Sequence, residues 1–371
     1  MDLYIDREEL SRGLARVQGI IERRSTFPIL SHVLLHAHAD GLKMTATDTE
    51  VAYIGELAAN IQKPGEIAVD AGNLFQVIRA LPEATVRLTV SGNQRLEIQS
   101  GRSQFKLPGA AARDFPAIAA FDARGTARLP ASALRHLVEQ TSFSVATEEH
   151  RSGLNGAHME ERPSDTGKVL RWVSTDGHRL SASEVRFEGD VFIAPRTLIP
   201  RKALGILRKL LEGDDANIEL SFGEGALRLV RPGQTFWFRL LDGEFPDYDA
   251  VVPKEGRHRI QIGRDELAAA LKRVAIVVQD RARAVRFAFR ETDLEIQVQN
   301  VDRGEVTEVV PIEIEGDPIT AGFNVRYLQD ILSVLEGNVV HIEMAHALAP
   351  CLVRDRERDD AFFVVMPMRL D

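Results

Sequence analysis

The sequence is poor in cysteine, in net basic charge and in long apolar runs, and each shortage excludes a class of protein. Cys351 is the single cysteine, so an intramolecular disulfide framework and a multi-cysteine zinc site are both excluded. Lysine and arginine together number 46 against 55 aspartates and glutamates, which gives a formal net charge of −9. This balance excludes a protein that binds nucleic acid with its whole surface, although an acidic chain can still carry one local basic face.

Signals for membranes and secretion are also missing. No run approaches the roughly 18 apolar residues that a transmembrane helix needs. The first residues, Met1 to Arg7, lack the basic and then apolar pattern of a signal peptide. Together with the single cysteine, these absences predict a protein of the reducing cytoplasm. The length of 371 residues predicts two to three domains at about 150 residues each.

Catalytic and cofactor motifs are equally scarce. The chain has no Walker loop, no G-x-G-x-x-G after a strand, no H-E-x-x-H and no G-x-S-x-G, and its ten histidines are scattered without metal spacing. The turn Ser174–Arg179 places serine, aspartate and histidine together, but a catalytic relay needs the base between the other two groups. We therefore expect no catalytic residue, no metal and no cofactor. An enzyme that uses this turn is the alternative from another functional class.

Internal repetition is the strongest feature that the sequence does contain. A pattern of arginine, an acidic residue, glutamate and leucine starts at Arg7 and again at Arg264. Leucine, arginine and valine follow at the same spacing in both copies. Each copy comes after a short alternating run, which predicts a strand, a tight turn and an amphipathic helix. A looser middle copy has its strand at 127–129 and its turn at Pro130.

A second kind of unit occurs three times. An apolar strand near residue 67, 198 or 319 leads into a helix, and two alternating segments then predict a hairpin. The simplest fold is α+β, with three similar domains that each hold two repeats of a helix and an antiparallel sheet. Polar, turn-rich stretches at 122–126 and 253–257 predict the domains 1–124, 125–254 and 255–371.

Basic side chains lie off the apolar stripes of the expected helices. On the first helix the stripe runs from Leu10 to Ile21, at about 100° per residue. Outside the stripes stand Arg12, Arg16, Arg79, Arg135, Lys202, Lys209, Lys272 and Arg273. Ordinary solvated helix faces explain any one of them. If equivalent helices point the same way, they form a positive surface that attracts a DNA backbone with one charge per ~1.7 Å. No base-reading motif is present, so such binding is independent of sequence.

The chain ends in an apolar segment, although termini are usually polar and loose. Val364 and Val365 predict a last strand paired into a sheet. The residues 366–370 that follow have no helix in which to pack. Methionine is over-used on surfaces that accept varied partners. The segment therefore favours a partner-binding groove over simple filling of a core.

These features together resemble the beta subunit of bacterial DNA polymerase III, the family of sliding clamps. The resemblance runs through the whole chain and is sharpest in six motifs, at 24–30 (RSTFPIL), 154–156 (LNG), 175–180 (TDGHRL), 245–248 (FPDY), 323–325 (FNV) and 365–370 (VMPMRL). It implies the DNA clamp fold, with helices lining a ring and sheets outside. It also implies a non-enzymatic function: a head-to-tail homodimer encircles double-stranded DNA, independently of its sequence, and gives the replicative polymerase its processivity.

The resemblance further implies partners and the residues that meet them. The alpha subunit of DNA polymerase III, clamp-loader subunits, other polymerases and repair proteins insert a short apolar peptide into a groove. By motif, that groove uses Leu154, Thr175, Gly177, His178, Arg179, Leu180, Pro246, Val251, Val364, Met366, Pro367, Met368, Arg369 and Leu370. The DNA-binding residues implied in the same way are Arg24, Arg79, Arg201, Lys202, Arg281 and Arg283.

Some positions depart from the family pattern. Ser152 and Gly153 stand where the family often has aromatic residues that touch DNA, and Ala250 replaces a basic residue at the groove rim. Asp371 follows the usual terminal leucine. Ala250 and Asp371 leave open a clamp-derived paralogue that serves as an inhibitor-tolerant second copy. The segment 160–168 predicts a longer surface loop.

Overall fold

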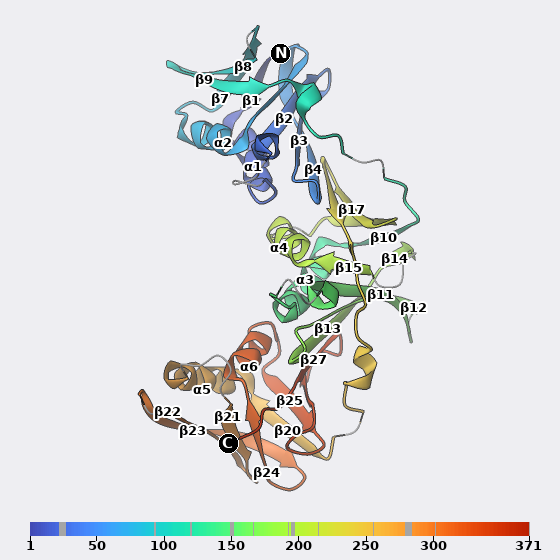
Figure 1. Cartoon of the computed structure of the whole chain (residues 1–371), viewed down its shortest axis with the longest axis vertical. Coiled ribbons are helices and arrows are strands. Elements are labelled where there is room, and N and C mark those ends of the chain that lie inside the picture. Colours follow the sequence, from blue (N-terminus) through green and yellow to red (C-terminus); the bar gives the residue numbers. More distant parts are fainter. Residues whose placement is uncertain are drawn as a thin grey trace. The chain divides into compact units, whose positions relative to one another are not determined.

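The computed structural model of the chain describes residues 1–21, 27–92, 94–118, 121–148, 152–165, 167–191, 193, 197–213, 215–254, 256–278, 284–300 and 302–370. It divides into two compact units, each built on one antiparallel sheet (Figure 1). The first unit comprises Met1–Ala131, Glu188–Ala194 and Gly205–Leu240, and the second comprises Ser132–Phe187, Pro195–Leu204 and Leu241–Asp371.

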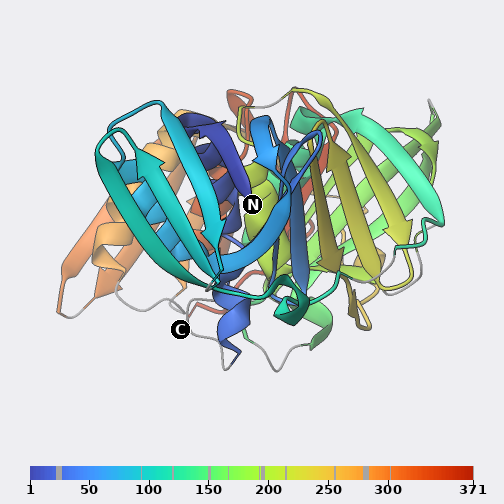
Figure 2. The ribbon, with the colours of Figure 1, turned by 90° about the horizontal axis from the view of Figure 1, so that it is seen from above.

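The first unit carries helices α1 (Arg7–Val17) and α2 (Ala71–Ala80), which pack against each other beside its sheet (Figure 1). The described strands of this sheet, in the order in which they pair, are β14 (Glu188–Asp190), β10 (Gly125–Pro130), β16 (Asn217–Gly223), β17 (Ala226–Arg231), β18 (Gln234–Arg239), β4 (Val51–Leu57), β3 (Gly41–Thr47), β2 (His32–His38), β6 (Gly65–Asp70), β9 (Ser103–Ala110), β8 (Arg95–Ser100), β7 (Thr85–Ser91), β1 (Asp2–Asp6) and β5 (Ala59–Lys63). Figure 2 shows the blue strand β4 beside the yellow strand β18, with which it pairs antiparallel although the two lie far apart in the sequence.

The second unit carries helices α3 (Ala131–Thr141), α5 (Arg264–Val277) and α6 (Val325–Leu332), while α4 (Arg201–Leu210) is divided between the units after Leu204. The described strands of its sheet, in pairing order, are β19 (Leu241–Asp242), β15 (Thr197–Pro200), β11 (Gly156–Ser164), β12 (Gly167–Thr175), β13 (Arg179–Arg186), β27 (Ala361–Val365), β26 (Cys351–Asp355), β25 (Val339–Met344), β20 (His258–Gly263), β23 (Gly304–Glu315), β22 (Asp293–Asn300), β21 (Val285–Phe289) and β24 (Ile319–Phe323). The predicted last strand is therefore β27, and it lies in the interior of this sheet between β13 and β26.

Each of the helices α1 to α5 begins directly after a strand, and α6 begins one residue after β24, which confirms the succession of strand and helix that the repeats predict. At three of these junctions an acidic or amide side chain caps the helix. Asp6 accepts from the backbone N–H groups of Glu8 and Glu9, both at 2.9 Å. Asp70 and Asn324 cap α2 and α6 in the same way. Such a cap stabilises a helix by about 1 kcal/mol.

The repeated arginine has the same partner in both of its copies. Arg7 Nη1 donates to the carbonyl of Leu81, just beyond α2, at 2.8 Å. Arg264 Nη1 donates to the carbonyl of Leu335, just beyond α6, at 2.7 Å. In each copy the first residue of one helix thus binds the chain leaving the neighbouring helix. This contact gives the repeated sequence pattern a physical reason.

The expected apolar stripes form the core. Leu10, Leu14 and Val17 on α1 are fully buried, and burial of side chains of this size contributes about 1.5–3 kcal/mol each. Ile21 is also buried, although it lies beyond the end of α1. The stripe of α5 is buried likewise, at Leu267, Leu271 and Val274.

Basic residues off the stripes have different environments. Arg79, Lys209 and Lys272 are exposed, whereas Arg135 and Lys202 are half-buried. Arg273 is bound to Glu308 by two hydrogen bonds of 2.7 Å. The charge of Arg273 is therefore already paired with a carboxylate on the surface. Within the described part of the chain, no helix is both long and apolar enough to cross a membrane.

The prediction of a longer surface loop at 160–168 is wrong. Strands β11 and β12 continue as an antiparallel hairpin up to the pair Ser164–Gly167. Lys168 and Glu161 form an ion pair across it at 3.0 Å. The polar composition of the segment suggested a loop, but cross-strand charge pairs stabilise a ladder as well as apolar pairs do.

Candidate functional site

An apolar cavity of about 180 Å³ lies in the second unit, where β12 and β27 end and β13 begins. Four separate segments form its walls: the 3₁₀ turn Ser152–Leu154, the turn that joins β12 to β13, the segment before and within the 3₁₀ turn Tyr248–Ala250, and the end of β27. The lining residues are Leu154, Thr175, Gly177, Arg179, Leu180, Pro246, Asp247, Tyr248, Val251, Val364 and Met366.

The turn from β12 to β13 is fixed by side chains that bind its own backbone. The Thr175 hydroxyl accepts from the N–H of Gly177 at 3.0 Å and donates to the carbonyl of Arg179 at 2.6 Å. The Asp176 carboxylate accepts from the N–H groups of His178 and Arg179, at 2.9 and 3.1 Å. Gly177 has φ 85°, a value that favours glycine. The polar turn predicted from the sequence is confirmed, and it forms a rigid cavity wall.

Arg179 is the best-fixed cation of the wall, since its side chain is only 11% exposed. Its guanidinium donates to Asp176 at 3.1 Å, to Asp330 on α6 at 2.5 Å and to the carbonyl of Phe143 at 2.7 Å. The same group lies 4.6 Å from the ring centroid of Tyr327. Three acceptors and an aromatic face thus fix this side chain in the cavity wall.

Tyr248 also lines the cavity and is held by a charged cluster. Its hydroxyl donates to Glu160, which also accepts from Arg162 Nε at 2.7 Å. Burial alone would raise the pKa of Glu160, but hydrogen bonds from His158, Tyr248 and Arg162 outweigh it and lower the pKa to about 2. Burial and the bond to Glu160 raise the pKa of Tyr248 above its ordinary value. Tyr248 is therefore a neutral donor, and its ring is fixed at the cavity.

The chain beyond β27 runs across the turn and then leaves the cavity. The N–H of Met366 donates to the carbonyl of His178 at 2.9 Å, and the Met366 side chain remains 37% exposed. Two residues later, Met368 donates to the carbonyl of Gly322 at 2.8 Å and forms a bridge with β24. The apolar segment is thus tied down at both ends and presents Met366 at the cavity.

The structure brings most of the predicted groove residues together. Those that line the cavity are Leu154, Thr175, Gly177, Arg179, Leu180, Pro246, Val251, Val364 and Met366. The ring of His178 stacks instead on Tyr327, with centroids 6.5 Å apart. Pro367, Met368, Arg369 and Leu370 follow outside the lining. The sequence prediction missed Asp247 and Tyr248, although both belong to the Phe-Pro-Asp-Tyr motif that signalled this segment.

Three of the predicted DNA-binding residues are described. Arg79 is exposed near the end of α2, with its guanidinium 5.4 Å from the ring centroid of Phe75. Arg201 is exposed at the start of α4, and Lys202 beside it is half-buried. Arg24, Arg281 and Arg283 lie outside the described residues, as does Asp371.

The residues of the suspected catalytic turn make separate contacts. The Ser174 hydroxyl is buried and donates to the carbonyl of Thr141, while Asp176 binds the backbone and Arg179. The imidazole of His178 stacks on Tyr327. Burial raises the pKa of the Cys351 thiol to about 12, so this thiol is a poor nucleophile. Among the described residues, no group of three or more histidine, cysteine or acidic side chains is placed to hold a metal ion.

Comparison with known proteins gives matches over nearly the whole chain. Family models of the DNA polymerase III beta subunit match at residues 1–119 (N-terminal domain), 128–247 (central domain) and 249–369 (C-terminal domain). The beta sliding clamp of Caulobacter vibrioides is 35% identical over 373 residues, and that of Escherichia coli is 32% identical over 372, with 100% of each chain covered. A crystal structure of a sliding clamp from Bartonella birtlesii, bound to griselimycin, matches with a TM-score of 0.95 and 34% identity over 100% of both chains.

Proposed function

The chain belongs to the DNA polymerase III beta subunit family, the DNA sliding clamps, and we propose that two copies close head to tail into a ring around duplex DNA. Each copy contributes three clamp domains, 1–124, 125–254 and 255–371. The ring tethers the replicative polymerase to its template in the cytoplasm. It has no catalytic residues of its own and acts as a processivity factor.

A ring resolves a conflict between holding DNA and moving along it. Tight phosphate contacts hold a protein in one place, whereas enclosure retains it with weak contacts that exchange as it slides. Base contacts specify sequence and phosphate contacts do not, so the sliding surface needs cations without base readout. The residues proposed for this surface are Arg24, Arg79, Arg201, Lys202, Arg281 and Arg283. Exposure of Arg79 and Arg201 supports this role.

Two open strand edges support closure of the ring, and this is the observation that carries the proposal. Among the described residues, 103–108 of β9 pair along one edge only, with β8, and 304–311 of β23 pair along one edge only, with β22. Phe105 on β9 is 39% exposed and Val309 on β23 is 59% exposed. An exposed apolar edge is a template for pairing with another chain.

The two edges also differ in charge. Arg102 lies next to β9, and Glu305 lies on β23, and both are exposed. An interface between two different surfaces is heterologous, and repeated head-to-tail pairing closes into a ring when the rotation permits. Pairing of β9 of one protomer with β23 of the next accounts for both edges.

The apolar cavity of the second unit is the proposed docking groove for partner peptides. Those partners are the polymerase alpha subunit, clamp-loader subunits, and other polymerases and repair proteins. Fixed walls at Arg179 and Tyr248 and an exposed anchor at Met366 support this assignment, since rigid apolar pockets concentrate binding energy. The groove uses Leu154, Thr175, Gly177, His178, Arg179, Leu180, Pro246, Val251, Val364, Met366, Pro367, Met368, Arg369 and Leu370, together with Asp247 and Tyr248.

The proposed pairing of two chains into a ring is tested by the mass of the protein in solution. We expect light scattering to give twice the chain mass for the wild type and one chain mass for Phe105→Arg and for Val309→Arg. Leu348→Arg is the matched control, because Leu348 is an exposed apolar residue on neither edge, and it is expected to leave the dimer intact. A monomeric wild type, or dimers in both edge variants, would contradict the proposal.

A further inference from the structure

The first unit contains a second copy of the turn that walls the docking groove. In Thr47–Val51, the Thr47 hydroxyl accepts from the N–H of Thr49 at 3.0 Å and donates to the carbonyl of Val51 at 2.9 Å. The Asp48 carboxylate accepts from the N–H groups of Glu50 and Val51, at 2.9 and 2.7 Å. Thr175–Arg179 makes the same bonds from the same atoms.

The backbone conformation agrees as well. Thr49 has φ 78° and its counterpart Gly177 has φ 85°. A threonine rarely adopts positive φ. Because Thr49 does so at this one position of the turn, the hydrogen bonds of Thr47 and Asp48 determine the turn in both places.

The other walls of the groove also have counterparts here. The N–H of Arg239, at the end of β18, donates to the carbonyl of Glu50 at 2.7 Å, as Met366 does to His178 at the end of β27. The segment Phe115-Pro116-Ala117-Ile118 stands where Phe245-Pro246-Asp247-Tyr248 stands in the groove. Both units therefore build a cavity from the same three parts: a turn, a strand end and a Phe-Pro segment.

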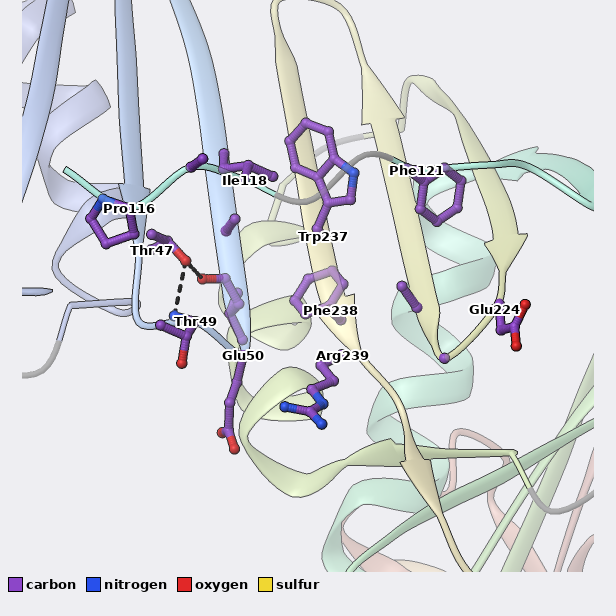
Figure 3. A pocket seen from close by; sticks show the side chains of 15 residues that line it. Thr47, Thr49, Glu50, Pro116, Ile118, Phe121, Glu224, Trp237, Phe238 and Arg239 are labelled. Carbon is purple, nitrogen blue, oxygen red and sulfur yellow. Dashed lines mark hydrogen bonds between the residues drawn. The ribbon is translucent and has the colours of Figure 1, made fainter. Parts of the chain in front are cut away.

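These parts enclose a cavity of about 380 Å³ in the first unit (Figure 3). Its apolar side chains include Ile118, Phe121, Trp237 and Phe238 (Figure 3). Thr47, Thr49, Val51 and Pro116 line it at the places that Thr175, Gly177, Arg179 and Pro246 take in the groove. The cavity is thus the internal counterpart of the groove, with more volume and different charges.

The charges indicate what this cavity would bind. Arg239 replaces Met366 at the rim, and its guanidinium has no ion-pair partner among the described residues. The indole Nε1 of Trp237 is buried in the wall, also without a hydrogen-bond partner among them. Two exposed carboxylates also line the cavity: Glu224, which is paired with Arg124 at 2.5 Å, and Glu50. Two donors without acceptors favour a ligand that brings acceptors.

We propose that this cavity is a second docking site, for a short peptide in which an apolar side chain precedes a carboxylate. The apolar side chain packs on Trp237 and Ile118, and the carboxylate binds Arg239. The peptide class rests on the proposed function of the groove, whereas the preference for an acidic residue comes from this cavity alone. In the groove the same rim position is held by Met366, so one peptide does not suit both sites equally.

The two tryptophans of the chain make the test direct. Trp172 is fully buried outside the cavity and Trp237 lines it. Fluorine NMR of the full-length protein labelled with fluorotryptophan therefore gives one probe signal and one internal reference, assigned with Trp237→Phe. The probe ligands are acetyl-Leu-Leu-Asp-amide and its isostere acetyl-Leu-Leu-Asn-amide, titrated into the millimolar range.

We expect the aspartate peptide to move the Trp237 signal saturably while the Trp172 signal stays in place. The asparagine peptide, and the aspartate peptide on Arg239→Gln, are expected to bind about tenfold more weakly, because each loses a charge-assisted hydrogen bond. Met366→Ala is the control in the groove and is expected to leave this titration unchanged.

A Trp237 signal that does not move, or that moves equally with both peptides, would overturn the second site. So would a titration abolished by Met366→Ala and unaffected by Arg239→Gln. Each of these results leaves the groove and the ring standing, because they are tested by partner-peptide binding and by mass. Loss of the dimer, in turn, leaves the Trp237 titration interpretable.

Discussion

Arg179 on β13 and Asp330 on α6 are joined by a hydrogen bond of 2.5 Å between guanidinium and carboxylate. The bond links the turn at the groove to the helix that follows β24. Since Arg179 is almost fully enclosed and Asp330 is 46% exposed, the arginine depends on its partners more than the aspartate does. One ion pair thereby couples the shape of the groove wall to the stability of the second unit.

Replacement of Arg179 by glutamine is expected to destabilise the protein by about 2 kcal/mol, because several charge-assisted hydrogen bonds are lost from an enclosed site. Urea unfolding measures this loss. Arg259→Gln is the matched control: Arg259 pairs with Glu315 at 3.7 Å on the surface, where an ion pair contributes about 0–1 kcal/mol. Equal effects of the two substitutions would contradict the role assigned to Arg179.

Truncation of Met366 to alanine is expected to weaken partner-peptide binding by about 2 kcal/mol or more, the usual effect of removing an anchor that the bound partner covers. The chain should remain folded, because Met366 is held through its backbone N–H, which alanine retains. Isothermal titration with a peptide from the polymerase alpha subunit measures the affinity. Leu348→Ala, another exposed apolar position, is the control, and an affinity unchanged by Met366→Ala would place the anchor elsewhere.

Acid is expected to destabilise the wall at Tyr248. The pKa of Glu160 is lowered from 4.5 to about 2 in the folded chain, so its contribution is complete above the unfolded value and is lost as the pH falls from about 4.5 towards 2. Thermal unfolding between about pH 5 and pH 3 is expected to show a steeper decline for the wild type than for Glu160→Gln. Parallel declines would mean that Glu160 titrates equally in both states.

Neutral substitutions on the helices should weaken DNA binding without changing sequence preference. For Arg79→Gln and for Arg201→Gln we expect lower affinity for every duplex. The slope of the logarithm of the affinity against the logarithm of the salt concentration should also become shallower by about one. Fluorescence anisotropy over a salt series measures both quantities. Arg113→Gln removes an exposed arginine outside the α-helices and is expected to change neither. A loss confined to one DNA sequence would indicate base readout.

The repeat pattern is what made the fold predictable. The succession of strand and helix at Arg7 and Arg264 follows from local spacing, and the same arginine contact recurs in both copies. Partners from distant segments were not visible in the sequence. Glu308 neutralises Arg273 from a strand that lies far along the chain, and the hairpin of β11 and β12 depends on pairing across a polar segment.

Most residues that line the cavity of the second unit could be named from sequence motifs, whereas those of its counterpart in the first unit could not. Thr175–Arg179 and Thr47–Val51 share only the first two residue types. The two turns make the same hydrogen bonds, but most of their donors are backbone N–H groups, which every residue type except proline carries. The likeness of the turns is therefore visible only in the structure. Tyr248 was missed for a related reason: its role depends on Glu160, which holds the ring in place.

Retention on circular and on linear DNA tests the central claim most directly. After loading onto a nicked circular plasmid by a clamp loader and separation from free protein by gel filtration, the protein is expected to stay with the circle through a high-salt wash. A single restriction cut should then release it, because a topological link ends when the DNA has free ends. Equal retention before and after the cut would contradict encirclement and indicate ordinary surface binding.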